Sequence, residues 1–373
     1  MKRLIVTGGG TGGHVYPALS IAREFLARGP GRRVLYVGAR RGLESTVIPE
    51  AGIPFRALRV EGFLGRGAAG KARSLLLLAS ALREAGGILA EFAPDVVVGT
   101  GGYVSVPVVM RAQLARIPTL IQEQNVLSGA ANRMLSHLAR AVAAPAVEAA
   151  GNFPRRVQSR LVVTGNPVRR DVISACRSDG RAQYGLGPGD VMLLVVGGSG
   201  GARTINRGTL DFVLDHLPEH PHLRVLWVTG PRYHEEVLLR LESAGAADRV
   251  RVMDYLRDMP SALAACDLLL CRGGAMSLAE AAAAGRPMII VPSPNVTHNH
   301  QQHNARALEG AGAAVVIPDC DFTGDSLQRV ISGLLDDCER MRAMAGASAA
   351  RGRPGALDEI MELIEGLARG GAR

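Results

Sequence analysis

Short runs of aliphatic residues recur along the whole chain and are separated by longer segments with helical periodicity. The runs lie at 4–6, 34–37, 96–98, 119–121 and 161–163, and again at 192–196, 225–228, 250–253, 268–270, 288–291 and 314–317. Because they are short, aliphatic and not alternating, they are typical of central parallel strands buried on both faces. Helical segments between them, such as 17–28 and 276–284, supply crossovers. The pattern therefore predicts an α/β fold that occurs twice in the chain.

A glycine-rich loop is repeated in the two halves. Both IVTGGGTGG (5–13) and LVVGGSGGAR (194–203) run from an aliphatic strand into glycines and then into a predicted helix. With a length of 373 residues, this predicts two Rossmann-like parallel-sheet domains facing a central cleft, with ligands beyond the carboxyl ends of the strands. The expected domains are 1–166 and 167–340.

The net charge of +9 is unevenly distributed. Residues 1–170 hold 23 Arg and Lys against 9 Asp and Glu, whereas residues 171–373 hold 20 against 25. This asymmetry indicates that the first half meets an anionic partner: nucleic acid, an anionic membrane surface or a phosphorylated substrate. Only 4% of the residues are aromatic, so platforms for base stacking are scarce and nucleic acid is disfavoured.

Cysteine usage and hydropathy limit the compartment. The five cysteines all lie in the second half and form no C-x-x-C pair, which is typical of reduced thiols in a cytoplasm. The N-terminal MKRLIVTGGG has too short an apolar run for a signal peptide, and no stretch approaches the roughly 18 to 20 apolar residues that span a bilayer. We expect a soluble or peripheral protein.

The first glycine loop admits two interpretations. Gly8, Gly10 and Gly13 fit the dinucleotide fingerprint, but the second strand ends in VGARR (37–41) without the acid that would hold an adenosine ribose. The two arginines there suit at most an NADP phosphate, so a nicotinamide enzyme is disfavoured. His14 either packs at the start of the first helix or, as a neutral imidazole, accepts a proton from a substrate hydroxyl.

The second half adds a more specific set of residues. In DLLLCRGGAMSLAE (267–280) a strand runs into Gly273 and Gly274, and the free N–H groups of the helix that follows can hold a diphosphate. Glu280 either accepts ribose hydroxyls or is an exposed helix residue paired with an arginine. Gln301 and Gln302 either bind sugar hydroxyls or cap a helix. The neighbouring histidines of HNHQQHNA (298–305) lack a matching carboxylate, so no metal site is expected.

Seven motifs occur in a fixed order and cover nearly the whole chain. They are GGGTGGHVYPAL (8–19), GTGGYVSVP (99–107), QEQN (122–125), GNPVR (165–169), GGSGGAR (197–203), GGAMSLAE (273–280) and QQHNA (301–305). Together they resemble the peptidoglycan N-acetylglucosaminyltransferases, nucleotide-sugar enzymes of the GT-B fold that make lipid II. The tail 341–373 resembles the C-terminal helices of that family.

The resemblance implies a reaction. The donor is UDP-N-acetylglucosamine (UDP-GlcNAc) and the acceptor is lipid I, an undecaprenyl-diphosphate-linked N-acetylmuramyl pentapeptide. GlcNAc passes to the C4 hydroxyl of the muramyl sugar with inversion, and UDP leaves. No cofactor or metal is implied. Peripheral attachment to the cytoplasmic face of the bacterial membrane follows, and cell-wall synthesis or division proteins are possible partners.

The resemblance also assigns residues. Donor contacts fall on Thr11, Gly12, Gly13, Asn125, Arg169, Ser199, Leu256, Ala275, Met276, Ser277, Leu278, Ala279, Glu280, Gln301 and Gln302. Within this set Leu256 marks a backbone amide that reads uracil, and Glu280 holds the ribose. Tyr103 lies on the acceptor side. Inversion needs a general base, for which His14 and Glu123 are the candidates, with His14 preferred beside the acceptor-side loop.

Three positions depart from the family pattern. Gln122 stands where the family usually has histidine, so that histidine is not an essential base here unless this chain is impaired. Val106 replaces a usual glycine, and Gly200 replaces a usual larger residue. The other motifs are intact, and we expect activity.

One segment is suited to a membrane surface. Residues 62–86 mix apolar and basic side chains, and the contact residues we expect are Phe63, Leu64, Arg66, Lys71, Arg73 and Leu75. The alternative is an ordinary core helix after a loop; the basic first half favours the membrane.

Three other functions are weighed against this one. Another GT-B transferase acting on a lipid or small-molecule acceptor is the nearest. A non-catalytic subunit is disfavoured because donor and acceptor motifs share one chain. A sugar-nucleotide epimerase is expected to have one Rossmann half and a Tyr-x-x-x-Lys pair, which Tyr103, Tyr184 and Tyr233 do not form.

Overall fold

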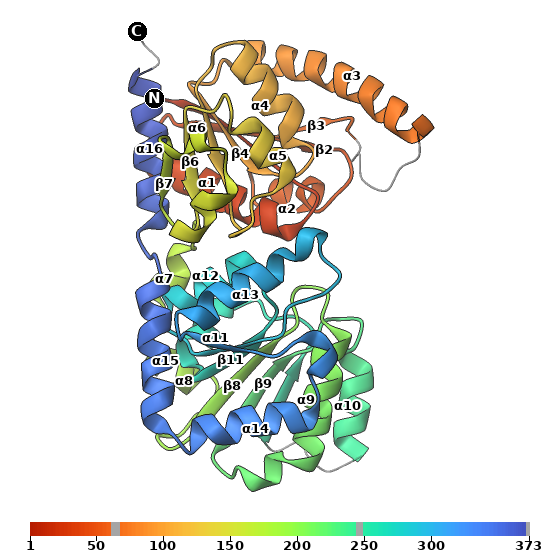
Figure 1. The fold of residues 1–373 in the computed structure, drawn as a ribbon, viewed down its shortest axis with the longest axis vertical. Coiled ribbons are helices and arrows are strands. Elements are labelled where there is room, and N and C mark those ends of the chain that lie inside the picture. Colours follow the sequence, from red (N-terminus) through yellow and green to blue (C-terminus); the bar gives the residue numbers. More distant parts are fainter. Residues whose placement is uncertain (61–67, 244–248, 371–373) are drawn as a thin grey trace. The chain divides into compact units, whose positions relative to one another are not determined.

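The computed structural model describes residues 1–60, 68–243 and 249–370. The chain forms two compact units (Figure 1): an N-terminal unit of residues 1–167 and 355–373, and a C-terminal unit of residues 168–354. Each unit contains one sheet, and every paired strand in both sheets is parallel. The predicted α/β fold with two Rossmann-like parallel sheets is confirmed.

The N-terminal sheet has the order β3-β2-β1-β4-β5-β6-β7. Its strands are β1 (Arg3–Gly8), β2 (Arg33–Ala39), β3 (Phe55–Leu58), β4 (Val96–Gly101), β5 (Thr119–Gln122), β6 (Ala141–Ala144) and β7 (Leu161–Val163). Its helices are α1 (Gly12–Ala27), α2 (Glu44–Glu50), α3 (Ala68–Phe92), α4 (Ser105–Leu114), α5 (Ala130–Leu135), α6 (Arg155–Gln158) and α16 (Ala356–Gly370). The strand order, and not the chain direction, reverses between β1 and β4. In open parallel sheets the ligand crevice is expected at the loops that follow the two strands on either side of such a reversal.

The C-terminal sheet repeats this topology, with the order β10-β9-β8-β11-β12-β13. Its strands are β8 (Val191–Val196), β9 (Leu223–Val228), β10 (Val250–Met253), β11 (Leu268–Cys271), β12 (Met288–Ile290) and β13 (Ala314–Val316). Its helices are α7 (Arg170–Ser174), α8 (Arg177–Gln183), α9 (Arg203–Asp215), α10 (His234–Ser243), α11 (Met259–Ala265), α12 (Ala275–Ala283), α13 (His300–Gly310), α14 (Gly324–Leu335) and α15 (Cys338–Arg351). Here the crevice falls between the loops after β8 and β11.

The unbroken aliphatic runs are explained by burial on both sides of each sheet. In β1, Leu4 and Val6 enter one apolar cluster while Ile5 enters the cluster on the opposite face. In β8, Leu193 and Leu194 divide between two clusters in the same way. Because successive strand residues point to opposite faces, a strand covered on both sides needs apolar residues at every position.

The last helix belongs to the N-terminal unit although it ends the chain (Figure 1). Ile360, Met361 and Ile364 of α16 are fully buried in the cluster that contains β1 and α1. Arg32 also donates to Glu365 at 2.9 Å. The apolar stripe at helical spacing and this ion pair hold α16 against the first unit.

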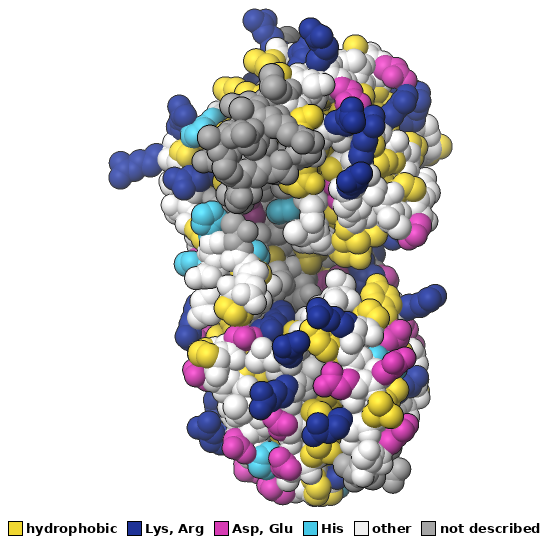
Figure 2. All heavy atoms as spheres, turned by 90° about the vertical axis from the view of Figure 1, so that its right-hand side faces the viewer, with side chains coloured by type: hydrophobic (Ala, Val, Ile, Leu, Met, Phe, Trp, Pro, Cys, Tyr) yellow, Lys and Arg dark blue, Asp and Glu magenta, His cyan; other side chains and the backbone are white. Residues whose placement is uncertain are grey.

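The surface charge differs between the units. Figure 2 shows Lys and Arg together with many Asp and Glu side chains on the C-terminal unit, whereas acidic side chains are sparse on the N-terminal unit. Among the described residues, no helix is both long and apolar enough to cross a membrane.

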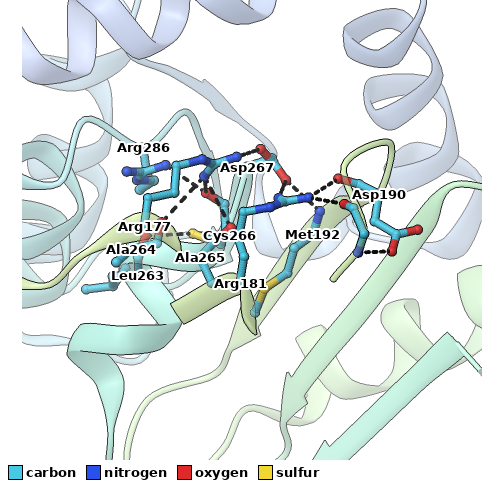
Figure 3. A network of polar contacts seen from close by, with 11 residues as sticks. Arg177, Arg181, Asp190, Met192, Leu263, Ala264, Ala265, Cys266, Asp267 and Arg286 are labelled. Carbon is cyan, nitrogen blue, oxygen red and sulfur yellow. Dashed lines mark hydrogen bonds and ion pairs between the residues drawn. The ribbon is translucent and has the colours of Figure 1, made fainter. Parts of the chain in front are cut away.

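A charged network fastens α8 to the start of β11 (Figure 3). The Asp267 carboxylate accepts hydrogen bonds from Arg177 at 2.5 Å, from Arg181 at 3.2 Å and from the Met192 backbone N–H at 2.8 Å. Arg177 also donates to the backbone carbonyl of Cys266 at 3.1 Å. The network ties a surface helix to the two central strands of this sheet.

We expect Asp267→Ala to lower the free energy of unfolding of the C-terminal unit by about 2 kcal/mol, because it removes the carboxylate that two guanidinium groups and a backbone N–H share. Urea unfolding followed by the fluorescence of Trp227, the sole tryptophan, which is buried in this unit, measures the change. Asp215→Ala, at an exposed position of α9, serves as the control and is expected to stay within about 0.5 kcal/mol of wild type. Equal stability of the two variants would contradict the structural role of Asp267.

Candidate active site

Two loops meet at the carboxyl end of β1 and β4 in the N-terminal unit. A Cβ added to Gly102 would lie 2.1 Å from the Gly9 carbonyl oxygen, and one added to Gly8 would lie 2.0 Å from the Thr100 hydroxyl oxygen. Gly102 also has φ +79°, which disfavours any side chain. The glycines of the first motif and of GTGGYVSVP are therefore required for this close backbone approach.

His14, in the first turn of α1, points into this junction. Its Nδ1 lies 3.0 Å from the Thr100 carbonyl oxygen and 2.9 Å from Gln124 Oε1. The Thr100 hydroxyl donates to the His14 carbonyl at 2.8 Å. A Cβ on Gly101 would lie 2.8 Å from His14 Nδ1, so glycine makes room for the ring. His14 is half-buried, and its ring is held through one nitrogen, Nδ1, as is typical of a positioned base.

The departure at Gln122 is accommodated by a buried amide network. Gln122 Nε2 donates to the Glu123 carbonyl at 3.0 Å and to Asn166 Oδ1 at 3.1 Å, and Gln122 Oε1 accepts from Gln124 Nε2. Asn166 Nδ2 in turn donates to the Gln124 carbonyl at 3.0 Å. The network joins the QEQN and GNPVR motifs, which are about 40 residues apart in the sequence.

The second candidate base, Glu123, has a different environment. Its Oε1 accepts from the N–H of Gln124 and of Asn125, both at 2.9 Å, and from Asn125 Nδ2 at 3.2 Å. Its Oε2 accepts from the Gly129 N–H at 3.0 Å and from Asn132 Nδ2 at 2.9 Å. The residue is fully buried. A carboxylate that already accepts five hydrogen bonds is suited to shaping the loop that contains Asn125, and of the two candidate bases we favour His14.

We expect Glu123→Gln to destabilise this loop by about 2 kcal/mol, because an amide has one acceptor oxygen and turns its NH₂ group toward donors. Hydrogen exchange of the amides in 123–129 should quicken, and unfolding followed by far-UV circular dichroism should begin at lower urea concentration. Glu91→Gln, which breaks an exposed ion pair with Arg56, is the control with little expected effect. If Glu123→Gln were as stable as wild type but its kcat were a hundredfold lower, Glu123 would be the better candidate for the general base.

A buried carboxylate that the motifs did not reveal lies beneath the first glycine loop. Glu44 is fully buried and accepts from the backbone N–H of Gly10 and of Ala39, both at 3.2 Å. A Cβ on Gly9 would lie 2.1 Å from its carboxylate oxygen. Glu44 begins α2 only five residues after β2 ends, and it fixes the shape of the loop.

Tyr103 and the residues at the start of α1 lie around this loop. The Tyr103 ring lies 3.4 Å from a Cβ built on Gly10. Thr11 and Gly13 are exposed and Gly12 is half-buried, where α1 begins. Phe63, Leu64 and Arg66 lie outside the described residues, as do the side chains of Lys71, Arg73 and Leu75 on α3.

In the C-terminal unit, α12 begins at the crevice with its backbone uncapped. Gly274 is its N-cap, and no described side chain accepts from the first turn. The N–H groups of Ala275, Met276 and Ser277 are therefore available to an anion, and the helix dipole favours negative charge there. Leu278 instead packs in the core, and Ala279 is half-buried against the same cluster.

Arg169 and Glu280 pair with each other. Arg169 Nε donates to Glu280 Oε1 at 3.1 Å, and Arg169 Nη1 lies 3.5 Å from Asp171 Oδ2. Burial raises the pKa of Glu280 above its ordinary value, and the Arg169 guanidinium offsets only part of this increase. Two residues that the resemblance assigns separately to the donor are thus one coupled group. The ion pair agrees with the alternative interpretation, in which Glu280 is a helix residue paired with an arginine, but Glu280 is largely buried and not exposed.

The other donor-side residues divide between ligand-facing and structural positions. Gln301 Oε1 accepts from the N–H of Gly273 at 3.2 Å and of Ser293 at 2.9 Å, so its oxygen ties two loops together. Gln302 is half-buried and Ser199 exposed. Leu256 is buried in the core, as expected for a position that acts through its backbone.

The histidines that follow β12 are separated from other candidate metal ligands. Across the described residues, no three His, Cys, Asp or Glu side chains are grouped so that they could hold a metal ion. His300 and His303 lie in the first turn of α13, and His298 lies in the 3-10 turn that precedes it; all three positions are exposed or half-buried.

Two family models match the chain. Residues 4–144 match the glycosyltransferase family 28 N-terminal domain, and residues 192–360 match the glycosyltransferase family 28 C-terminal domain. A relative from Desulfitobacterium hafniense (strain Y51) is 45% identical over 97% of this chain and 98% of its own length. One from Moorella thermoacetica is 44% identical with the same coverage. Both are named UDP-N-acetylglucosamine–N-acetylmuramyl-(pentapeptide) pyrophosphoryl-undecaprenol N-acetylglucosamine transferase.

Solved structures are also similar. Acinetobacter baumannii MurG superposes with a TM-score of 0.79 at 27% identity, covering 98% of this chain and 99% of that one. A UDP-GlcNAc 2-epimerase from Neisseria meningitidis superposes with a TM-score of 0.67 at 16% identity, over 97% of this chain and 99% of its own, which shows the fold alone. The expectation that an epimerase has a single Rossmann half is therefore wrong for this class, and fold does not separate it from a transferase.

Proposed function

The chain belongs to glycosyltransferase family 28, and from this premise we propose that it transfers N-acetylglucosamine from UDP-GlcNAc to lipid I, releasing UDP and forming lipid II. The observation that carries the proposal is the 45% identity, over nearly the full length of both chains, to a transferase named for this reaction. The two crevices support it, because one offers a positioned imidazole and the other an uncapped helix start beside an arginine.

The proposed mechanism uses these groups without a metal. His14 takes the proton from the C4 hydroxyl of the acceptor as that oxygen attacks the anomeric carbon of GlcNAc from the face opposite to UDP. The bond between the anomeric carbon and the diphosphate breaks, and UDP leaves with the bonding electrons. The N–H groups at the start of α12, together with Arg169, stabilise the charge that develops on the diphosphate. Glu280 accepts the ribose hydroxyls, and Gln301 and Gln302 contact the GlcNAc hydroxyls.

Transfer of labelled GlcNAc to a short-chain lipid I analogue in the presence of EDTA tests the proposal, with UDP-glucose and UDP-GalNAc as competing donors. Product formed from UDP-GlcNAc in EDTA supports the reaction, the donor and metal independence together, and shows that Gln122 is compatible with activity. Absence of product despite thermal stabilisation by UDP-GlcNAc would overturn the acceptor and favour another GT-B transferase with a different lipid or small-molecule acceptor.

Because lipid I is anchored by its polyprenyl chain, we also propose that the N-terminal unit binds the anionic cytoplasmic surface of the membrane through residues 62–86. The basic surplus of residues 1–170 supports this. Helix α4, which packs against α3, adds the exposed apolar side chains of Met110 and Leu114, the latter 65% exposed. Apolar residues flanked by basic ones are typical of peripheral membrane contact.

Charge reversal at Arg66, Lys71 and Arg73 is expected to weaken co-sedimentation with vesicles containing anionic lipid by about a hundredfold, since each basic residue near the surface contributes about 1 kcal/mol. Binding to neutral vesicles should change little.

The matched control reverses three exposed arginines of the C-terminal unit, Arg240, Arg329 and Arg353, and should bind the anionic vesicles like wild type. Equal loss in both triple variants would mean that net charge alone governs binding, and no loss in the first would remove residues 62–86 as the contact.

A further inference from the structure

The side-chain amide of Gln124 is surrounded by oxygen atoms. Gln124 is 2% exposed, and its Nε2 donates to the carbonyl oxygens of Thr100 at 2.8 Å and Gln122 at 2.9 Å, and to Gln122 Oε1 at 2.5 Å. An amide NH₂ group has two hydrogens and three acceptors here, so it is fully engaged.

These contacts determine which way the amide faces. If it were reversed, its oxygen would meet three acceptor oxygens, and no hydrogen would lie between any of them. Buried polar groups are paired in native structures because an unpaired one is costly. The oxygen of Gln124 must therefore face the other side, where it lies 2.9 Å from His14 Nδ1.

The orientation of the amide determines the protonation of the ring. His14 Nδ1 faces two oxygen acceptors, Gln124 Oε1 and the Thr100 carbonyl, so Nδ1 carries the hydrogen in the neutral imidazole. Nε2 then has no hydrogen and presents its lone pair. A base that accepts the substrate proton on Nε2 requires this tautomer. In catalytic triads, removing the group that fixes the tautomer of the histidine lowers kcat by a large factor.

We propose that Gln124 is a positioning residue that sets the tautomer and ring orientation of His14, and that Gln122 holds the Gln124 amide in the required direction. The proposal deepens the proposed function and rests on it for the identity of the proton donor. It also gives the departure at Gln122 a purpose, because the Gln122 carboxamide supplies an acceptor to Gln124 and is itself anchored to Asn166.

The first measurement is the tautomer itself, which needs no activity. Long-range proton–nitrogen correlation spectra of protein labelled with ¹⁵N-histidine distinguish the two neutral tautomers, and the His14 signals are assigned by their loss in His14→Asn. We expect a protonated Nδ1 and a bare Nε2. A wild-type ring protonated on Nε2 would overturn the proposal even if the enzyme transfers GlcNAc as proposed.

The second measurement compares Gln124→Met with Gln113→Met. Gln113 donates to the Leu135 carbonyl at 2.9 Å elsewhere in the same unit, so its substitution removes a similar amide and leaves His14 untouched. We expect kcat of Gln124→Met to fall about tenfold while the KM for UDP-GlcNAc stays within about twofold, and its His14 signals to show a mixture of tautomers. Gln113→Met should match wild type in both.

Unchanged kcat and an unchanged tautomer in Gln124→Met would overturn the proposal. If Gln124→Met does not fold, Gln122→Leu leaves Gln124 in place but removes the acceptor at Oε1 and the bonds of Gln122 to Asn166 and to the Glu123 carbonyl. It should still broaden or shift the Nδ1 signal of His14. If wild type has no transferase activity at all, the proposed function fails, whereas the tautomer spectra still decide what Gln124 does to the ring.

Discussion

Replacing His14 with asparagine is expected to lower kcat by at least about a hundredfold, the range that a positioned general base contributes. Asparagine is the informative choice because its side-chain N–H can occupy the place of Nδ1 and still donate to Thr100 and Gln124. It lacks only the atom at Nε2. Steady-state rates with UDP-GlcNAc and a soluble lipid I analogue measure the loss, and UDP affinity measured by calorimetry should not change.

The control for this substitution is His222→Asn, at an exposed position of the C-terminal unit, which should retain wild-type rates. A His14→Asn enzyme with a kcat within threefold of wild type would exclude His14 as the base. A loss of UDP affinity equal to the loss of kcat would instead mean that His14 serves donor binding.

The strand predictions succeeded where the strand is a continuous aliphatic run, including the half-exposed edge strand β7, and two strands were missed for physical reasons. β6 has the sequence AVAA, and alanine has little strand preference on its own; its neighbours β5 and β7 and the covering layers make it a strand. β3 lies at the sheet edge with the sequence FRAL, where only Leu58 is fully buried. Edge position and small residues weaken the signal that periodicity carries.

The candidate site was only partly accessible from sequence because motifs give positions but not partners. QEQN and GNPVR were recognised as motifs, yet the bonds between Gln122 and Asn166 depend on β5 and β7 lying in one sheet. Glu123 was a reasonable base by residue type, and only its five donors show a structural role. Glu44 belongs to none of the motifs. The structure reveals it, because its carboxylate occupies the space that a side chain in place of the neighbouring glycines would need.

Glu280→Ala is expected to weaken UDP binding by about a hundredfold. The carboxylate that accepts two ribose hydroxyls is lost, and hydrogen bonds to charged groups contribute roughly 1.5 to 3 kcal/mol each. Arg169 also loses the partner that holds it at 3.1 Å. Glu280→Gln should lie between Ala and wild type, because an amide still accepts one hydroxyl but no longer pairs with the guanidinium. Calorimetric titration with UDP gives each dissociation constant.

The control is Glu236→Ala, at an exposed position of α10, which should bind UDP like wild type. If Glu280→Ala bound UDP with an affinity within threefold of wild type, the assignment of Glu280 to the ribose would be wrong. Its only remaining role would be the ion pair with Arg169.

The pH dependence of UDP binding separates the charge of Glu280 from its shape. Burial raises the pKa of this carboxyl above its ordinary value, so it takes up a proton at a higher pH than an exposed glutamate does. Protonation removes one acceptor and the ion pair with Arg169, so affinity should fall as pH falls through that raised pKa. UDP itself also takes up a proton on its terminal phosphate, but this weakens binding to wild type and to Glu280→Gln alike. The ratio of the dissociation constant of Glu280→Gln to that of wild type therefore reports on Glu280 alone. We expect this ratio to fall toward one as the pH is lowered. A ratio that does not depend on pH would mean that Glu280 does not bind UDP as a carboxylate.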